Sequence, residues 1–249
     1  GSEMCIRDRI YGSDKPDLRI DLTATNVSSL FEGSSFEVLA DKTVKAVAIS
    51  NCSLTRKQID KLLTDCEVQA GAKGYWFKVD EKGDLAGGIA KFVDKEAASK
   101  LLPLEPNTLV LVAGGELATK LVGVMIKTFG PACEGHMDKE RYEFCWIVDF
   151  PMYEIGEESG ELEFCHNPFS MPQGGMDALN NQDPLDILAY QYDLVCNGVE
   201  LSSGAVRNHD PEIMIKAFEL VGLGEDDVKA KFPAMYNAFC YGCLLYTSP

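Results

Sequence analysis

The sequence predicts an α+β protein whose strands pair mainly antiparallel. Between residues 27 and 137, short β-branched segments alternate with segments of helical periodicity, which indicates a compact mixed unit. After residue 142, strand-like segments follow one another with turn residues between them. The pair Asn197-Gly198 adds a strong two-residue hairpin signal, because both residues tolerate positive φ angles. With 249 residues, 46% of them hydrophobic, the chain can build one large domain or two ordinary ones.

Capping residues and apolar periodicity predict the helices of the first half. Thr55 lies at the start of a helix whose apolar residues recur at helical spacing until Gly71 ends it. Asp94 can cap a second helix that runs to Leu102. A third helix is expected over residues 115–129, with its apolar stripe on Leu117, Leu121, Met125 and Phe129.

Strands are expected between these helices, and a linker after them. The strand-like segments are residues 36–39, 44–49, 75–79 and 108–113. Residues 131–140 lack a periodic pattern, so we expect a linker there, with His136 at the protein surface.

The second half is predicted to begin as an antiparallel meander and to end in helices. The Asn197-Gly198 turn should join strands over residues 192–195 and 199–201. Asp183-Pro184 and Asp210-Pro211 each place a capping acid before a proline, which predicts two helix starts. The further expected strands are residues 142–148, 150–154 and 162–167, and the further expected helices are residues 225–232 and one from Pro233.

Composition narrows the class of function. The net charge of −16 argues against a broad nucleic-acid-binding face, so any RNA contact should be local. The nine cysteines are odd in number and scattered, which is typical of reduced thiols in a cytosolic protein. No apolar run approaches the ~18 residues that a membrane span needs. We therefore expect a cytoplasmic protein without a membrane segment.

The stretch from Glu200 to Arg207 is the most unusual in the chain. It places an acid and an arginine on either side of Leu-Ser-Ser-Gly-Ala-Val, directly after the predicted hairpin turn. If the stretch is extended, its ends lie roughly 23 Å apart, so an amino acid could reach both only if Gly204 bends the strand. A nucleotide-sized ligand could span them. The alternative is that both residues are ordinary surface residues and that Gly204 marks a bulge.

His166 is the third candidate site residue. Strand alternation places it in line with Leu162 and Phe164, just before Pro168 ends the strand. A histidine in that position is either a half-buried residue with satisfied hydrogen bonds or a ligand-binding group. Phosphate-binding glycine loops, nucleophile elbows and metalloprotease helices are absent from the sequence, so the functional hypothesis depends on His166, Glu200 and Arg207.

Four stretches taken together resemble the bacterial type of aspartyl-tRNA synthetase, a class II family. Their order and spacing match, and the resemblance covers about residues 10–242. The stretches are Tyr-Gly-Ser-Asp-Lys-Pro-Asp-Leu-Arg at 11–19, Trp-Ile-Val-Asp-Phe-Pro-Met at 146–152, His-Asn-Pro-Phe-Ser at 166–170 and Glu-Leu-Ser-Ser-Gly-Ala-Val-Arg at 200–207.

The resemblance implies a fold and a division of the chain. Residues 10–26 and 141–242 would belong to the antiparallel β core of a class II synthetase, which helices flank. Residues 27–140 would form an inserted small α+β domain of the GAD type. Residues 1–9 and 243–249 do not fit the family, so we expect them to be unrelated tails on an internal fragment.

The resemblance also implies an activity, with roles for the three candidates. The family activates L-aspartate with ATP to aspartyl-adenylate and transfers it to the 3′ end of tRNA. His166 and Arg207 match the residues that bind L-aspartate, and Glu200 matches a residue on the ATP side that can coordinate Mg²⁺. The implied partners are L-aspartate, ATP, tRNA-Asp with tRNA-Asn as a second candidate, and a second subunit in a full-length homodimer.

The chain also departs from the family pattern. Asn167 stands where many bacterial members have a second histidine, and Ser202-Ser203 stand where glycines are common. The anticodon-binding barrel, the first motif, and the arginines of the second and final motifs are missing, so we expect the isolated chain not to aminoacylate. The alternatives are a related class II synthetase for asparagine or lysine, and a non-catalytic tRNA-binding module.

Overall fold

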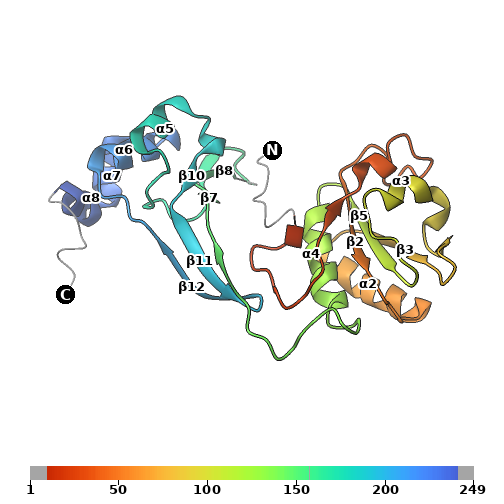
Figure 1. The fold of residues 1–249 in the computed structure, drawn as a ribbon. Coiled ribbons are helices and arrows are strands. Elements are labelled where there is room, and N and C mark those ends of the chain that lie inside the picture. The colour runs from red at the N-terminus through yellow and green to blue at the C-terminus, as the bar shows by residue number, and fades with distance from the viewer. Residues whose placement is uncertain (1–9, 157, 241–249) are drawn as a thin grey trace. The chain divides into compact units, whose positions relative to one another are not determined.

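The computed structural model describes residues 10–156 and 158–240, which fall into two compact units. The N-terminal unit comprises residues 10–145 and 195–199, and the C-terminal unit comprises residues 146–194 and 200–240. Figure 1 shows helices and antiparallel strands in both, which confirms the predicted α+β class. The tails expected at residues 1–9 and 243–249 lie outside the described residues.

An antiparallel sheet with the strand order β1-β2-β5-β3-β4 forms the centre of the N-terminal unit. Its middle strand pairs with β2 on one side and with β3 on the other, and all but its last residue are buried. A strand buried on both faces needs an apolar layer above and below it. The strands are β1 Thr25–Asn26, β2 Val44–Ile49, β3 Gly74–Val79, β4 Leu85–Ala86 and β5 Leu109–Gly114.

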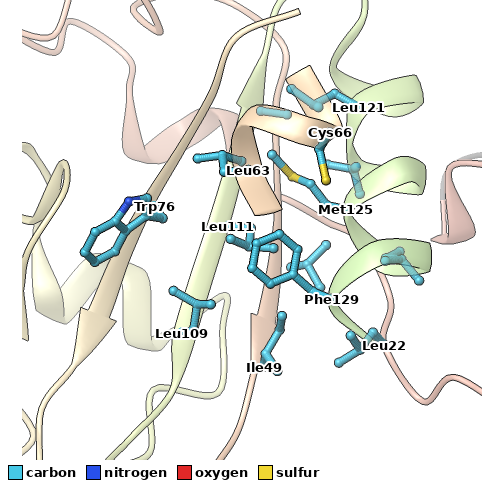
Figure 2. Packing of buried hydrophobic residues seen from close by; sticks show 14 of the residues in the cluster. Leu22, Ile49, Leu63, Cys66, Trp76, Leu109, Leu111, Leu121, Met125 and Phe129 are labelled. Atoms are coloured by element: carbon cyan, nitrogen blue, oxygen red, sulfur yellow. The ribbon is translucent and has the colours of Figure 1, made fainter. Parts of the chain in front are cut away.

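Two helices, α2 (Arg56–Ala70) and α4 (Ala118–Phe129), cover one face of this sheet. Thr55 caps α2 in a reciprocal capping box with Gln58, and Gly71 ends the helix at a φ of 73°. Figure 2 shows the apolar layer between the helices and the sheet. Its members include Ile49, Leu63, Cys66, Leu109, Leu111, Leu121, Met125 and Phe129.

Loops and short helices cover the opposite face of the sheet. Val110 and Val112 alternate with the helix-facing residues of β5 and pack against Phe31 and Leu39. The prediction of a strand at residues 36–39 is wrong, because this segment turns, with the Leu39 N–H donating to the Phe36 carbonyl. The short helices are η1 Ser28–Leu30, η2 Ala90–Phe92 and α3 Lys95–Ser99, the last shorter than predicted.

Residues 10–26, which we expected in the catalytic segment, pack within the N-terminal unit. Ile20 and Leu22 belong to its helix-facing core, and Gly12 lies against Gly123 in the middle of α4. A Cβ on Gly123 would overlap the carbonyl oxygen of Gly12, and Gly12 itself has a φ of 62°. The close approach of two backbones therefore explains a glycine inside a helix.

We expect Gly123→Ala to destabilise the N-terminal unit by about 2 kcal/mol. The gain in helix propensity is only about 1 kcal/mol, whereas overpacking against a backbone costs about 1–3 kcal/mol or more. Urea unfolding measures the difference. Gly71→Ala is the control, because a Cβ on Gly71 would meet no atom within 4 Å and only the positive φ of this residue opposes the change. A Gly123→Ala protein as stable as the parent would contradict the account.

His136 is buried, so its predicted surface position is wrong. The side chain is 8% exposed, and its ring nitrogens lie 2.7 Å from an Asp21 carboxylate oxygen and 2.8 Å from the Ser50 carbonyl oxygen. Both partners are acceptors, so the doubly protonated imidazolium satisfies both contacts. Burial lowers the pKa of His136, but the bonds to Ser50 and Asp21 outweigh it and raise the pKa above its ordinary value.

This raised pKa gives the N-terminal unit a pH-dependent stability. A group whose pKa is higher in the folded than in the unfolded state stabilises the fold. This stabilisation is complete at a pH below the unfolded-state pKa and is lost as the pH rises through the folded-state pKa. We expect the stability advantage of the parent over His136→Gln to fall by about 1 kcal/mol between about pH 5.5 and pH 9. Urea titrations of both proteins measure it. Asp21→Asn should remove part of the effect, and a pH-independent difference would contradict this account.

The C-terminal unit combines short strand pairs with four helices along its described residues. Strand β11 lies between β12 and β6, while β8 pairs with β9 and β7 pairs with β10. The strands are β6 Phe144–Ile147, β7 Phe150–Pro151, β8 Tyr153–Ile155, β9 Leu162–Phe164, β10 Leu188–Ala189, β11 Gln191–Cys196 and β12 Val199–Ala205. Three of them include residues counted with the N-terminal unit: 144–145 of β6, 195–196 of β11 and 199 of β12. The helices are α5 Gly175–Asn181, α6 Pro211–Leu220, α7 Glu225–Lys231 and α8 Pro233–Cys240.

The helix predicted from Asp183 is reduced to a single 3₁₀ turn, η3 (Pro184–Asp186). Asp183 does cap this turn, but Leu188 and Ala189 then pair with Pro151 and Phe150. Strand pairing therefore overrides the local helix signal. By contrast, Asp210 caps α6 as predicted, accepting from the N–H groups of Glu212 and Ile213. Along the described residues, none of the helices is long and apolar enough to cross a membrane.

Candidate functional site

The predicted hairpin is present, and it positions Glu200. Strands β11 and β12 are neighbours in the sheet, and Asn197 and Gly198 join them with φ angles of 52° and 79°. Two successive positive φ angles match the twist of a tight antiparallel hairpin. Glu200 is the second residue of β12 and is exposed.

Strand β12 continues through Gly204, so the bend that would bring Glu200 toward Arg207 does not form. A Cβ on Gly204 would lie 2.6 Å from ring atoms of Tyr192, so this glycine allows an aromatic ring to cross the strand closely. Residues 200–205 are extended in β12, so Glu200 and Ala205 lie roughly 17 Å apart along the strand. Glu200 and Arg207 therefore lie toward opposite ends of the stretch.

The segment 166–170 is anchored in the core of the C-terminal unit by Phe169. Its ring lies 5.8 Å from the ring of Phe218 on α6 and 5.3 Å from that of Phe232, centroid to centroid. Asn167 turns the backbone locally, because its Oδ1 accepts from the Phe169 N–H at 3.0 Å. Gln191 donates from Nε2 to the Asn167 carbonyl at 3.2 Å. Packing and hydrogen bonds thus fix the segment on both sides.

A backbone ladder joins this segment to the end of the Glu200–Arg207 stretch. Met171 N–H donates to the Val206 carbonyl, and Asn208 N–H donates to the Phe169 carbonyl, each at 2.8 Å. Between these two bonds, Ser170 and Arg207 face each other as an antiparallel bridge. The structure therefore brings together the segments that carry His166 and Arg207, although they are far apart in the sequence.

His166 lies beyond the end of β9, which stops at Phe164, so its predicted place on the strand is wrong. Its side chain is exposed, and its ring packs edge-on against Phe150 of β7 with centroids 5.0 Å apart. Phe150 belongs to the stretch 146–152. Three of the four family-like stretches therefore meet in the C-terminal unit, through Phe150 with His166 and Ser170 with Arg207.

Two buried polar residues support this arrangement and were not predicted from the sequence. Gln191 is 8% exposed and holds the Asn167 carbonyl, while Asn208 is 1% exposed and bonds to the Phe169 carbonyl through its backbone. The Asn208 side chain also accepts from the Asp210 N–H at 3.0 Å, which links the ladder to the start of α6. Asn208 directly follows Arg207, a signal that could have been used, whereas Gln191 offers none.

The fourth stretch, residues 11–19, lies in the N-terminal unit and forms a loop with an internal ion pair. Arg19 donates from Nε and Nη2 to the two carboxylate oxygens of Asp17, at 2.9 and 2.7 Å. This two-pronged contact lowers the pKa of Asp17. Ser13 accepts from Lys127 of α4 at 2.9 Å, so the loop is fastened to the helix as well.

The metal-binding capacity of the site is limited to single carboxylates. Across residues 10–156 and 158–240, no group of three or more His, Cys, Asp or Glu side chains is arranged to hold a metal ion. Glu200 can supply one carboxylate, which suits a cation bound mainly by water and phosphate oxygens. A cavity of about 650 Å³ is lined by residues that include Lys42, Thr43 and Gly115, and by none of the three predicted residues.

Comparison with known proteins identifies the family. Residues 4–245 match the family model of tRNA synthetases class II (D, K and N). The chain is 50% identical to the Aspartate–tRNA ligase of Streptomyces coelicolor over 238 residues, and 44% identical to the Aspartate–tRNA(Asp/Asn) ligase of Acidiphilium cryptum over 242 residues. Each alignment covers 93% of this chain and 40% of the relative, so the chain spans less than half the length of these proteins. The chain belongs to the class II tRNA synthetases of the D, K and N type.

Proposed function

We propose that this chain is part of an aspartate–tRNA ligase in which His166 and Arg207 bind L-aspartate. The observation that carries this proposal is the backbone ladder that pairs residues 169–171 with residues 206–208. Main-chain hydrogen bonds hold the segments that carry His166 and Arg207 next to each other, which supports a shared binding site for the two side chains. The relatives named aspartate–tRNA ligases, which align with 93% of this chain, support the same assignment.

Charge is the basis on which such a site selects its amino acid. The guanidinium of Arg207 offers a planar fork that binds a carboxylate with two charge-assisted hydrogen bonds. The neutral amide of asparagine cannot accept both bonds, so it leaves a cationic donor unpaired. A protonated His166 would add a second penalty of the same kind. Aspartate is therefore favoured both by attraction and by the cost of binding its uncharged analogue.

Glu200 is proposed to act on the ATP side of the site. Residues 200–205 extend along β12 over roughly 17 Å, so Glu200 suits contact with a second substrate rather than with the amino acid that Arg207 binds. A carboxylate beside triphosphate oxygens is repelled unless a cation lies between them, so Mg²⁺ is the proposed partner of Glu200. When bound, the cation would neutralise phosphate charge, and the carboxylate of Glu200 would orient it.

The proposed reaction has two steps. The α-carboxylate of L-aspartate attacks the α-phosphorus of ATP, which forms aspartyl-adenylate and releases pyrophosphate. A ribose hydroxyl at the 3′ end of tRNA-Asp then attacks the activated carbonyl carbon and releases AMP. In this scheme Arg207 and His166 hold the aspartate side chain while the α-carboxylate reacts, so their contribution is orientation and charge recognition.

The N-terminal unit is proposed to contain the inserted GAD-type domain, and the full-length protein is proposed to be a homodimer in the cytoplasm. The separate core of this unit, with its own sheet between two apolar layers, supports an inserted domain.

Pyrophosphate exchange into ATP, measured on the full-length protein that contains this chain, tests the proposed function. We expect exchange that depends on L-aspartate and stays near background with L-asparagine or L-lysine. Exchange driven by asparagine or lysine would refute the aspartate assignment in favour of another member of the D, K and N group. Absence of exchange with all three would favour a tRNA-binding module without catalysis.

A further inference from the structure

Two cysteines from distant parts of the sequence meet inside the N-terminal unit. The Sγ atoms of Cys52 and Cys133 lie 3.8 Å apart, and each residue is 5% exposed. Cys52 follows the end of β2, and Cys133 follows the end of α4. Both are free thiols in the structure. A sulfur–sulfur bond is about 2 Å long, so side-chain rotation with a small backbone shift can close this gap.

The backbone around the pair is already held in place. Cys52 N–H donates to the Asn107 carbonyl, and Cys133 N–H donates to the Phe129 carbonyl, each at 2.9 Å. The two segments are also joined directly, because His136 Nε2 lies 2.8 Å from the Ser50 carbonyl oxygen. The chain therefore keeps the two sulfurs adjacent with contacts that do not involve the sulfurs themselves.

The surroundings favour a thiolate on one of the two sulfurs. The contact with Cys133 is the largest cause that lowers the pKa of Cys52; burial opposes it, and the charges of Lys78 and His136 add to the lowering. The same bond, with burial, raises the pKa of Cys133. Lys78 is fixed nearby, because its Nζ donates to the Leu54 carbonyl at 2.6 Å. A thiolate on one sulfur can therefore be stabilised by the thiol of the other.

Cys66 shows what an ordinary buried cysteine looks like in the same core. It is fully buried on α2, and burial raises its pKa. Its chemistry is therefore that of an inert thiol. Burial alone therefore does not explain the lowered pKa of Cys52, which depends on the neighbouring Cys133 sulfur.

We propose that Cys52 and Cys133 form a redox-active dithiol that a small peroxide converts to a disulfide. The Cys52 thiolate attacks one oxygen of hydrogen peroxide, which breaks the O–O bond, releases hydroxide and leaves a sulfenic acid on Cys52. The Cys133 sulfur then attacks the Cys52 sulfur, and the sulfenic oxygen leaves as water with the Cys133 proton. The two sulfurs supply the two electrons that reduce the peroxide.

The burial of the pair limits the size of the oxidant, and the sequence separation of the two cysteines determines the effect of a disulfide on stability. At 5% exposure, the pair admits a water-sized peroxide far more readily than a bulky disulfide reagent. The bond would close a loop between positions 81 apart in the sequence, which removes conformational entropy from the unfolded chain. The oxidised N-terminal unit should therefore be the more stable form.

Peptide mapping of the native 249-residue chain tests the proposal directly. The folded protein is treated with hydrogen peroxide, free thiols are alkylated after denaturation, and a non-reducing digest is examined by mass spectrometry. We expect a peptide pair joined through Cys52 and Cys133, with Cys66 recovered as an alkylated thiol. Recovery of Cys52 and Cys133 as thiols, or a bond from Cys52 to another cysteine, would overturn the proposal.

Thermal unfolding gives an independent measurement with matched variants. Oxidation should raise Tm by about 5 °C or more, and a thiol reductant should reverse the rise. Cys133→Ser should abolish the rise and leave a Cys52 sulfenic acid that dimedone traps, whereas Cys66→Ser should keep the rise. A rise that survives in Cys133→Ser would contradict the assigned pair. If Cys133→Ser fails to fold, the peptide map of the unsubstituted chain decides alone.

Discussion

Arg207→Ala in the full-length protein is expected to lower kcat/KM for aspartate in pyrophosphate exchange by about 10³-fold. Truncating one partner of a charge pair that bound aspartate would bury costs about 2–5 kcal/mol, which is about 30-fold to about 5,000-fold and includes this value. The backbone of residue 207 bridges to Ser170, and this bridge does not need the arginine side chain, so the ladder should persist in the variant. The loss should therefore reflect recognition of aspartate rather than misfolding.

Two further variants give this prediction its specificity. Arg207→Lys keeps the charge but loses the planar fork, so we expect an intermediate loss, larger than about tenfold. Arg56→Ala is the matched control: Arg56 lies on α2 with its side chain 81% exposed and an ion pair of 3.6 Å to Asp60. Exposed pairs contribute little, so its kinetics should stay near those of the parent. An Arg207→Ala enzyme with a normal response to aspartate would contradict the proposed role.

Phe129→Ala is expected to destabilise the N-terminal unit by about 3–5 kcal/mol. Phe129 is completely buried at the end of α4, and Figure 2 shows its ring in the layer between the helices and the sheet. Removing the ring loses its transfer free energy and leaves a cavity that rigid neighbours cannot fill. The Phe129 carbonyl still accepts from the Cys133 N–H in the variant, so the loss should reflect the missing side-chain packing.

Urea unfolding followed by tryptophan fluorescence measures this loss of unfolding free energy in the N-terminal unit. The chain has two tryptophans: Trp76 is 8% exposed in the N-terminal unit and Trp146 is 61% exposed, so a Trp146→Phe background reports mainly on Trp76. Val68→Ala is the control, because Val68 is 80% exposed on α2 and its loss should cost less than about 0.5 kcal/mol. Equal midpoints for Phe129→Ala and Val68→Ala would refute the proposed packing.

Elements whose signals are local could be predicted from the sequence. The α2 helix follows its capping residue Thr55 and ends at Gly71, and the hairpin follows its Asn197-Gly198 turn. In both cases the deciding interactions lie within a few residues. Periodicity also identified Leu121, Met125 and Phe129 of the helix-facing core, although Leu117 is 43% exposed because α4 starts at Ala118, three residues later than predicted.

Features that depend on distant partners could not be predicted in this way. His136 is buried because Asp21 and Ser50 accept its protons, and neither is near it in the sequence. The segment after Asp183 forms a strand because β7 offers a pairing edge. Local propensity is a weak prior wherever such a tertiary partner exists.

The candidate site shows the same division. Residue type and order were enough to select His166, Glu200 and Arg207, but their spatial relation comes from long-range hydrogen bonds. The ladder between residues 169–171 and 206–208 follows from strand pairing that the sequence does not encode locally. Gln191, which supports it, carries no motif that separates it from other polar residues, whereas Asn208 is marked only by its place next to Arg207.

A double-mutant cycle on His166 and Arg207 tests the central claim most directly. Affinity for L-aspartate is measured by calorimetry in the full-length protein, in His166→Ala, in Arg207→Ala and in the double variant. If the ladder places both side chains around one carboxylate, the cycle should show a coupling energy of at least about 1 kcal/mol. Losses that add to within about 0.3 kcal/mol would show independent sites and contradict the account.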